Sequence, residues 1–192
     1  MEVRALEDRD EAALRAFFQA IPDEDRGFFK EDLDEPAVLR RWIDDARGVR
    51  IVACDEGRVA GVAAVWPGIG RSAHVGDLRL VVARERRRQG VGQLLARHAL
   101  ADALREGMWK ITVEVVAQEQ GTIDMFMALG FVAEALLRDQ LALSDGERQD
   151  VVLLSHFADE AGQDVLLAAP DEAPWRRSPS TVPTPSTRSS PR

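Results

Sequence analysis

The sequence has 192 residues, of which 45% are hydrophobic, and a formal net charge of −8. This size and composition suit one folded domain with a sizeable core, and the acidic balance argues against a nucleic-acid-binding surface, because phosphate backbones attract an excess of Lys and Arg. Cys54 is the only cysteine, and the chain shows neither a secretory signal pattern nor the ~20-residue apolar run of a membrane span, so we expect a cytoplasmic protein without disulfides or membrane association.

The first half of the chain alternates between strand and helix patterns. A strand is predicted over residues 2–6, followed by a helix that Asp8 caps and whose apolar residues recur at helical spacing. Pro36 starts a second helix. Strands over 50–54 and 59–66 follow, and the Asp-Glu-Gly-Arg turn between them is typical of a β-hairpin. The expected buried positions of the two helices are Ala12, Leu14, Phe17, Phe18, Val38, Leu39, Trp42 and Ile43.

The second half contains further strands and helices, each bounded by glycine or by a polar turn. Their predicted order is strand 74–83, helix 91–106, strand 110–116, helix 122–129, strand 131–143 and strand 149–157. Residues 1–158 therefore make one domain. An extension over 159–173 follows, and then a Pro-, Ser-, Thr- and Arg-rich tail over 174–192, which has too little apolar mass to order.

The most informative motif joins the strand over 74–83 to the next helix and reads Arg87-Arg88-Gln89-Gly90-Val91-Gly92. A helix start leaves backbone N–H groups unpaired at the positive end of the helix dipole, and glycines let a phosphate approach them. A P-loop needs Lys where this chain has Gln93, so the motif is not a P-loop. A dinucleotide-binding turn needs a small residue where this chain has Leu95, so that motif is absent as well. Neighbouring cations suited to phosphates are Arg84, Arg86, Arg87 and Arg88. The motif predicts a phosphate-binding turn, and its alternative is a glycine turn beside a solvated basic patch.

This Arg-x-x-Gly-x-Gly motif resembles the acetyl-CoA pyrophosphate loop of the GNAT-type (GCN5-related) N-acetyltransferase superfamily. The order of predicted elements over 2–157 matches that family, and so do local sequences at 112–115, 129–131 and 145–150. The resemblance implies an α/β (α+β) fold with a mixed, mostly antiparallel seven-stranded sheet, parallel splayed central strands and four flanking helices. It also implies transfer of an acetyl group from acetyl-CoA to a primary amine by direct attack.

The resemblance places acetyl-CoA between the strands over 74–83 and 110–116. Its pantetheine would follow the first strand like an added strand, its pyrophosphate would lie on the amides of the glycine turn, and an N–H near Val82 would polarise the thioester. The implied cofactor-binding residues are Leu80, Val81, Val82, Arg87, Arg88, Gln89, Gly90, Val91, Gly92 and Phe126. No metal is expected, because no Cys/His cluster has ligand spacing.

Two acids on these strands are the candidate catalytic residues, because an alkylamine must lose a proton before it attacks, at a cost of roughly 4.6 kcal/mol at pH 7. Asp77 lies where some protein-modifying members of the family carry a glutamate base and is expected to be the main proton acceptor. Glu114 lies on the neighbouring strand, and a water between the acids could relay the proton. His74 is a third candidate. The alternatives are structural: the acids are exposed or pair with Arg79 or Lys110, and the histidine is a satisfied strand residue.

Phe126 departs from the family pattern, because it stands at the position of the tyrosine credited with protonating the departing thiolate. The chain has no tyrosine at all, and Glu119 replaces a frequent asparagine near the pantetheine. A thiol is a tolerable anionic leaving group, so slower transfer is expected rather than none. These departures keep a second function open, an acyl-CoA-binding sensor or interaction module with weak or no catalysis.

The acceptor is predicted to be a small-molecule or peptide amine. The segment over 21–35 overhangs the acceptor site in this family, and here it carries seven acids against two bases. Such a field would favour a cationic acceptor, and a solvated acidic loop is the alternative. The sequence leaves open the acceptor's identity, the acyl chain length and whether the protein is a homodimer.

Overall fold

The computed structural model describes residues 1–22, 35–44, 47–143 and 146–158. The predicted C-terminal extension and tail, and most of the acid-rich segment, lie outside these ranges. The elements are β1 (Glu2–Ala5), the 3-10 turn η1 (Asp8–Asp10), α1 (Glu11–Gln19), α3 (Pro36–Asp44), β2 (Val49–Asp55), β3 (Arg58–Pro67), η2 (Gly70–Ser72), β4 (Val75–Val82), η3 (Arg84–Arg86), α4 (Val91–Arg105), β5 (Lys110–Val116), α5 (Gln120–Ala128), β6 (Val132–Ala142) and β7 (Arg148–Phe157).

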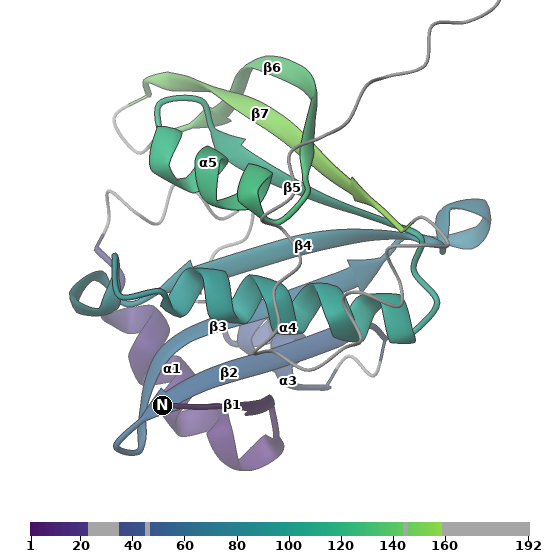
Figure 1. Ribbon diagram of the computed structural model, residues 1–192. Helices are drawn as coiled ribbons and strands as arrows, with labels where there is room; N and C mark the ends of the chain where they lie inside the picture. The colour runs from purple at the N-terminus through teal and green to yellow at the C-terminus, as the bar shows by residue number, and fades with distance from the viewer. Residues whose placement is uncertain (23–34, 45–46, 144–145, 159–192) are drawn as a thin grey trace, which may run out of the picture.

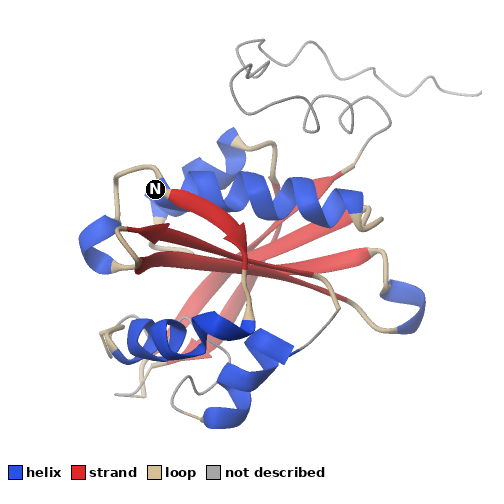
Figure 2. Ribbon diagram, turned by 90° about the horizontal axis from the view of Figure 1, so that it is seen from below, coloured by secondary structure: helices blue, strands red, loops and turns tan. Residues whose placement is uncertain are grey.

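One mixed sheet forms the middle of the molecule, with seven strands in the order β1-β2-β3-β4-β5-β7-β6. The neighbours β4 and β5 are parallel, and the other pairs are antiparallel. Figure 2 shows the sheet between two layers of helices, and Figure 1 identifies them as α1 and α3 on one face and α4 and α5 on the other. The predicted fold class is therefore confirmed, and the described ranges contain four flanking helices.

Each face of the sheet has its own hydrophobic core. Under α1 and α3, the rings of Phe18 and Trp42 pack edge to face with centroids 5.4 Å apart. Under α4 and α5, Leu95 and Leu100 are fully buried against the central strands. The predicted buried stripe of α3 is correct, whereas Ala12 of α1 is exposed. None of the described helices is long and apolar enough to cross a bilayer.

Two local predictions had different outcomes. The hairpin between β2 and β3 is confirmed, and its two turn residues, Glu56 and Gly57, have φ values of 49° and 77°, as a type I′ turn requires. The cap predicted at Asp8 is wrong, because residues 8–10 form a 3-10 turn and α1 begins at Glu11.

The sheet opens into a fork at the C-terminal ends of β4 and β5. The last pair of their short parallel ladder is Asp77 with Thr112. On their outer sides both strands continue, since β4 pairs with β3 up to Val82 and β5 pairs with β7 up to Val116. The two strands therefore diverge, as Figure 1 shows. The Thr112 hydroxyl donates to the Gly76 carbonyl at 3.1 Å and ties the strands together at the closed end of the fork.

Gly76 leaves no room for a side chain at that closed end. A Cβ there would lie 2.5 Å from Val65 Cγ1, 2.7 Å from Met108 Sδ and 2.9 Å from Ile111 Cδ1. Real Cβ atoms do not approach other atoms so closely, because interiors are close-packed. The absence of a side chain at residue 76 thus allows β4 to lie directly against the core beneath α4.

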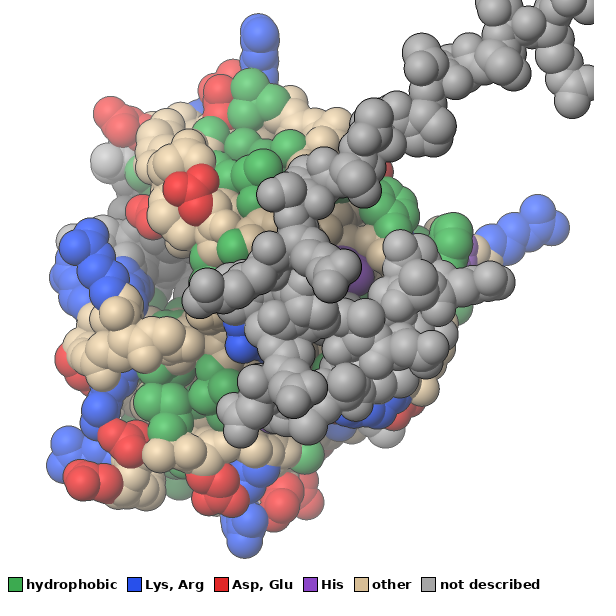
Figure 3. All heavy atoms as spheres, viewed as in Figure 1, with side chains coloured by type: hydrophobic (Ala, Val, Ile, Leu, Met, Phe, Trp, Pro, Cys, Tyr) green, Lys and Arg blue, Asp and Glu red, His purple; other side chains and the backbone are tan. Residues whose placement is uncertain are grey.

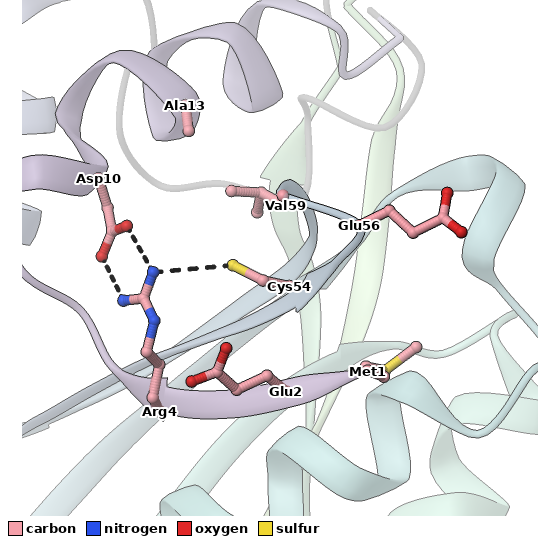
Figure 4. Close-up of a pocket in the computed structure, with 9 residues that line it drawn as sticks. Met1, Glu2, Arg4, Asp10, Ala13, Cys54, Glu56 and Val59 are labelled. Carbon is pink, nitrogen blue, oxygen red and sulfur yellow. Dashed lines mark hydrogen bonds and ion pairs between the residues drawn. The ribbon is translucent and has the colours of Figure 1, made fainter.

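Arg4 joins β1 to the turn that precedes α1, beside a pocket of about 380 Å³ (Figure 4). Its guanidinium donates to both oxygens of Asp10 at 2.6 and 2.8 Å, and one oxygen also accepts the Glu7 N–H at 2.9 Å. These bonds hold the pKa of Asp10 below its ordinary value, although burial opposes the shift. In the same pocket, burial raises the pKa of the Cys54 thiol, which disfavours a nucleophilic thiolate.

The Arg4–Asp10 pair predicts acid sensitivity. The lowered pKa means that the pair stabilises the fold above the ordinary carboxyl range, and this contribution is lost as pH falls through the lowered pKa. Asp10→Asn should therefore reduce the free energy of unfolding at pH 7 by about 1 to 3 kcal/mol and by progressively less toward pH 2. Urea unfolding at a series of pH values measures this, with exposed Asp8→Asn as the control. A deficit for Asp10→Asn that is independent of pH would contradict the prediction.

Candidate functional site at the open end of the fork

The inner edge of β4 carries backbone groups with no strand partner in the described part of the fork. The Ala83 N–H donates to Ala60 and the Gly68 N–H donates to the Val75 carbonyl, so the odd-numbered residues of β4 are bonded to β3. Alternate residues of a strand direct their backbone groups to opposite sides. Leu80 and Val82 therefore present their backbone groups to the fork, beyond the end of the β4–β5 ladder.

The charged side chains of β4 lie on only one of its two faces. Leu80 and Val82 pack toward the core under α4, whereas Val81 belongs to the core under α1 and α3. Asp77 and Arg79 share the face of Val81, because side chains alternate along a strand. The fork is thus apolar toward α4 and α5 and charged toward α1 and α3.

The glycine turn has the geometry predicted for a helix-start anion site. Gly90 is the N-cap of α4 with φ of 82°, and a Cβ there would meet no atom within 4 Å. The first α-helical bond runs from the Leu94 N–H to the Gly90 carbonyl, so the N–H groups of the first turn have no intrahelical acceptor. A Cβ at Gly92 would lie 3.5 Å from Met125 Sδ, beside the inner face of the fork. The amides of the turn are therefore open to a ligand from outside the helix.

The arginines of the turn have different positions. Arg87 Nε donates to the Val82 carbonyl at 3.3 Å, which links the turn to the edge of β4. Arg88 is exposed with φ of 60°. Arg86 instead forms an ion pair with Asp55 at 2.8 Å, so it anchors the turn to the β2–β3 hairpin rather than adding a phosphate donor. The Gln89 side chain donates to a carbonyl of η3 at 2.8 Å. Figure 3 shows Lys and Arg side chains gathered at the end of the molecule where this turn lies in Figure 1.

Asp77 lies at the closed end of the fork. Its side chain is 40% exposed, and Oδ2 accepts from Arg79 Nε at 3.3 Å and Nη2 at 3.1 Å. The Arg79 guanidinium also lies over the Trp66 ring, 5.4 Å from its centroid. Trp66 is the cross-strand neighbour of Asp77, so the three side chains form one cluster. Trp66 and Arg79 are the residues of this cluster that the sequence pattern did not propose as parts of the site.

Glu114 lies on the same face as Asp77. Ile111, Val113 and Val115 of β5 face the core under α4, so Glu114 faces the opposite side. It stands two residues beyond Thr112, the partner of Asp77, and is therefore level with Arg79 across the widening fork. Glu114 is part-buried, and Oε2 is inaccessible to solvent. Both predicted acids thus border one face of the fork, with Glu114 further toward its open end.

The remaining candidates lie away from the open edge. His74 is exposed before β4, and its carbonyl accepts the N–H groups of Trp109 and Lys110 at the closed end. The Phe126 ring is 2% exposed and packs against Phe131 with centroids 5.1 Å apart, so it is part of the core under α5. His156 is buried beside the same Phe131 ring. Among the described residues, no group of three or more His, Cys, Asp or Glu side chains could hold a metal ion.

Comparison with known proteins gives a consistent result. The family model described as "Acetyltransferase (GNAT) family" matches residues 14–131. No curated protein sequence matches the chain. Among solved structures, a GNAT-family acetyltransferase from Streptococcus pneumoniae superposes with a TM-score of 0.72 at 22% identity, covering 82% of this chain and 99% of that one.

Two further structures are similar. A GCN5-related N-acetyltransferase from Kribbella flavida has a TM-score of 0.70 at 25% identity, with 82% of this chain and 97% of that chain covered. The protein yncA from Salmonella typhimurium, solved with its cofactor acetyl-CoA, has a TM-score of 0.68 at 20% identity, with 83% and 95% covered. The family model spans more than half of the chain, and the fork, the glycine turn and the element order agree with it. The chain belongs to the acetyltransferase (GNAT) family.

Proposed function

We propose that this protein is a cytoplasmic N-acetyltransferase that transfers the acetyl group of acetyl-CoA to a primary amine by direct attack in a ternary complex. One observation carries the proposal: beyond Asp77 the inner edge of β4 has no strand partner in the described part of the chain, and it ends beside the open helix-start amides at Gly90. A strand edge can bond an extended amide chain, and helix-start amides can bind phosphates. Acetyl-CoA joins these two chemical features in one molecule.

The turn and the strand edge would bind opposite ends of this co-substrate. The amides of residues 88–92 would receive the pyrophosphate, and Arg88 would add an exposed cation. The backbone of Leu80 and Val82 would bond the pantetheine, and one of these N–H groups would polarise the thioester carbonyl. Holding the thioester and amine together supplies the entropic part of the catalysis, so no nucleophilic side chain is needed.

The acids would accept the proton of the amine. As the nitrogen–carbon bond forms, the carbon–sulfur bond breaks, its electron pair leaves with sulfur, and a proton passes from nitrogen to a carboxylate directly or through water. Asp77 is about 10 Å along the strand from Leu80, at 3.3 Å per residue, and its Oδ2 is already bonded to Arg79. Glu114 is level with Arg79, one residue from Leu80. Along the strand direction Glu114 is thus closer to the level of Leu80, and the proposal makes it the acceptor, with Asp77 acting through water or by holding Arg79 in place.

A second candidate function rests on Phe126, whose buried ring offers no hydroxyl to the departing thiolate. A domain of this fold could bind acyl-CoA as a sensor or interaction module without turnover. The two functions differ in a thiol-release assay with acetyl-CoA and a panel of amines. Release of CoA that depends on the amine supports the enzyme, whereas tight binding without release from any member of the panel supports the module.

The phosphate end of the proposed site can be tested at Gly90. Gly90→Ala places a methyl group where phosphate would approach the amides, and should weaken acetyl-CoA binding by about tenfold or more in calorimetry. The variant also strains the backbone, since φ at Gly90 is 82°. Gly107→Ala is a matched control, because Gly107 has φ of 83° and equally open surroundings at the other end of α4. Both variants should lose similar stability, and equal acetyl-CoA affinity in the two would refute the site.

The proton acceptor of the proposed site can be tested at Glu114. Glu114→Gln should lower kcat by the ~10² to 10⁴ of a lost general base, and the deficit should shrink at high pH, where more of the amine is neutral. Asp77→Asn should lower kcat as well, to a smaller extent if water relays the proton. Asp102→Asn is the control, because Asp102 is a half-exposed residue near the C-terminal end of α4, and circular dichroism checks folding. Retention of full activity at pH 7 by both Glu114→Gln and Asp77→Asn would show that neither acid is the base.

A further inference from the structure

Trp66 contacts the charged cluster at the closed end of the fork from the neighbouring strand. It lies on β3 opposite Asp77, and Arg79 is the next residue of β4 on the same face. The Arg79 guanidinium lies over the Trp66 ring, 5.4 Å from its centroid. Diagonal neighbours on adjacent antiparallel strands are within reach of long side chains, so the register of the sheet brings the ring and the cation together. A cation is attracted by the face of an indole ring more strongly than by that of Phe or Tyr.

The Trp66 ring is itself held by the core under α1 and α3. It packs edge to face against Trp42, with ring centroids 4.8 Å apart and an interplanar angle of 88°. Trp42 is 1% exposed and packs in the same way against Phe18. Three aromatic rings, from α1, α3 and β3, therefore form a column that ends at the Arg79 guanidinium. Because packed interiors allow little displacement, this column holds the Trp66 ring in one orientation.

The indole nitrogen of Trp66 indicates that the ring, rather than its polar group, is used. Trp66 Nε1 is inaccessible to solvent and donates no hydrogen bond within the described residues. An unpaired buried N–H costs free energy of folding, and a phenylalanine at this position would avoid that cost. The contact with Arg79 is a gain that the indole ring provides and that offsets the cost of its buried N–H.

Arg79 in turn constrains the carboxylate of Asp77. Two guanidinium nitrogens, Nε and Nη2, donate to Asp77 Oδ2 at 3.3 and 3.1 Å. The other oxygen, Oδ1, accepts no hydrogen bond from the described residues. The Asp77 side chain is 40% exposed, so water can reach Oδ1 on the face of the fork that Glu114 also borders. The contacts thus leave one oxygen of this carboxylate fixed and the other available.

We propose that Trp66 is a positioning residue for the proton transfer. Its ring holds Arg79, Arg79 occupies Oδ2 of Asp77, and Oδ1 accepts a hydrogen bond from the water that relays the proton. This water takes a proton from the amine nitrogen and gives one to the Glu114 carboxylate, while Asp77 stays ionised. Without the ring, the Arg79 side chain can leave the carboxylate, and the water loses its fixed acceptor. The inference rests on the proposed function and adds to its proton path a residue from a third strand.

A double-mutant cycle tests the path from Trp66 to Asp77, with kcat for the fastest amine of the thiol-release panel as the readout. Trp66→Leu should lower kcat about tenfold, while the calorimetric Kd for acetyl-CoA stays within about twofold, because the strand edge and the glycine turn are unchanged. In the Asp77→Asn background the same change should lower kcat by less than about twofold, since no carboxylate is left to position. Equal losses in the two backgrounds would show that Trp66 does not act through Asp77 and would overturn the proposal.

Further variants separate positioning from a loss of stability. Val52→Ala is the matched control, because Val52 is fully buried in the same core on β2; it should cost stability but leave kcat within about twofold in both backgrounds. Trp66→Phe keeps a ring under Arg79 and should retain at least about a third of the native kcat. If Trp66→Leu does not fold, Arg79→Lys replaces it in the cycle. Lysine keeps the charge but lacks the two-nitrogen contact with Oδ2, so the same loss and the same dependence on Asp77 are expected.

An NMR measurement distinguishes this inference from the proposed function. The Nε–H bond of Arg79, assigned by its absence from Arg79→Lys, should be ordered in the native protein and in Val52→Ala. Its order parameter should fall below about 0.6 in Trp66→Leu. If amines are acetylated but this order parameter does not depend on Trp66, the transferase function stands and the positioning role is wrong. If it depends on Trp66 but the native protein acetylates no amine, the transferase function fails and the proton-transfer role of Trp66 fails with it, while the contact with Arg79 stands.

Discussion

The termination of the β4–β5 ladder at Asp77 and Thr112 is the constraint on which the rest of the site depends. Strand edges normally pair, because an unpaired backbone N–H or carbonyl loses hydrogen-bond energy when it is removed from water. Here each strand has a full antiparallel partner on its outer side, β3 for β4 and β7 for β5. Those ladders hold the two halves of the sheet on diverging courses. Among the described residues, no strand bridges the two inner edges where they diverge, so their remaining backbone groups face the opening of the fork.

Charge is distributed unevenly around this opening. The chain as a whole is acidic, yet arginines are concentrated where β4 passes into α4 and at the adjoining hairpin. One of these arginines, Arg86, forms an ion pair with Asp55. That pair fixes the turn to the hairpin and thereby places Arg84 and Arg87 beside the second half of α1. Among the described residues, several arginines thus gather at this end of β4 although the chain as a whole is acidic.

Much of the fold could be predicted from the sequence because its signals are local. The glycine at residue 57, the proline at 36 and the glycine at 90 each mark a backbone conformation that few other residues favour. Relations between distant segments could not be predicted in this way. The level of Glu114 relative to β4 depends on where the parallel ladder ends, and the pocket beside α1 is lined by segments that meet only in the fold. The burial of Phe126 follows from its contact with Phe131, which a comparison of motifs does not reveal.

The two ends of the fork differ in how well they tolerate substitution, and Gly76 lies at the end that tolerates it least. Any side chain at this residue would force the side chains of Val65, Met108 and Ile111 to move, so the core under α4 disfavours substitution at this end of the fork. At the other end, Arg58, Arg84 and Glu85 are exposed and contribute little to that core. Substitutions there should cost the fold little stability. Homologues with this glycine should therefore keep the closed end of the fork, while the exposed residues at its other end vary.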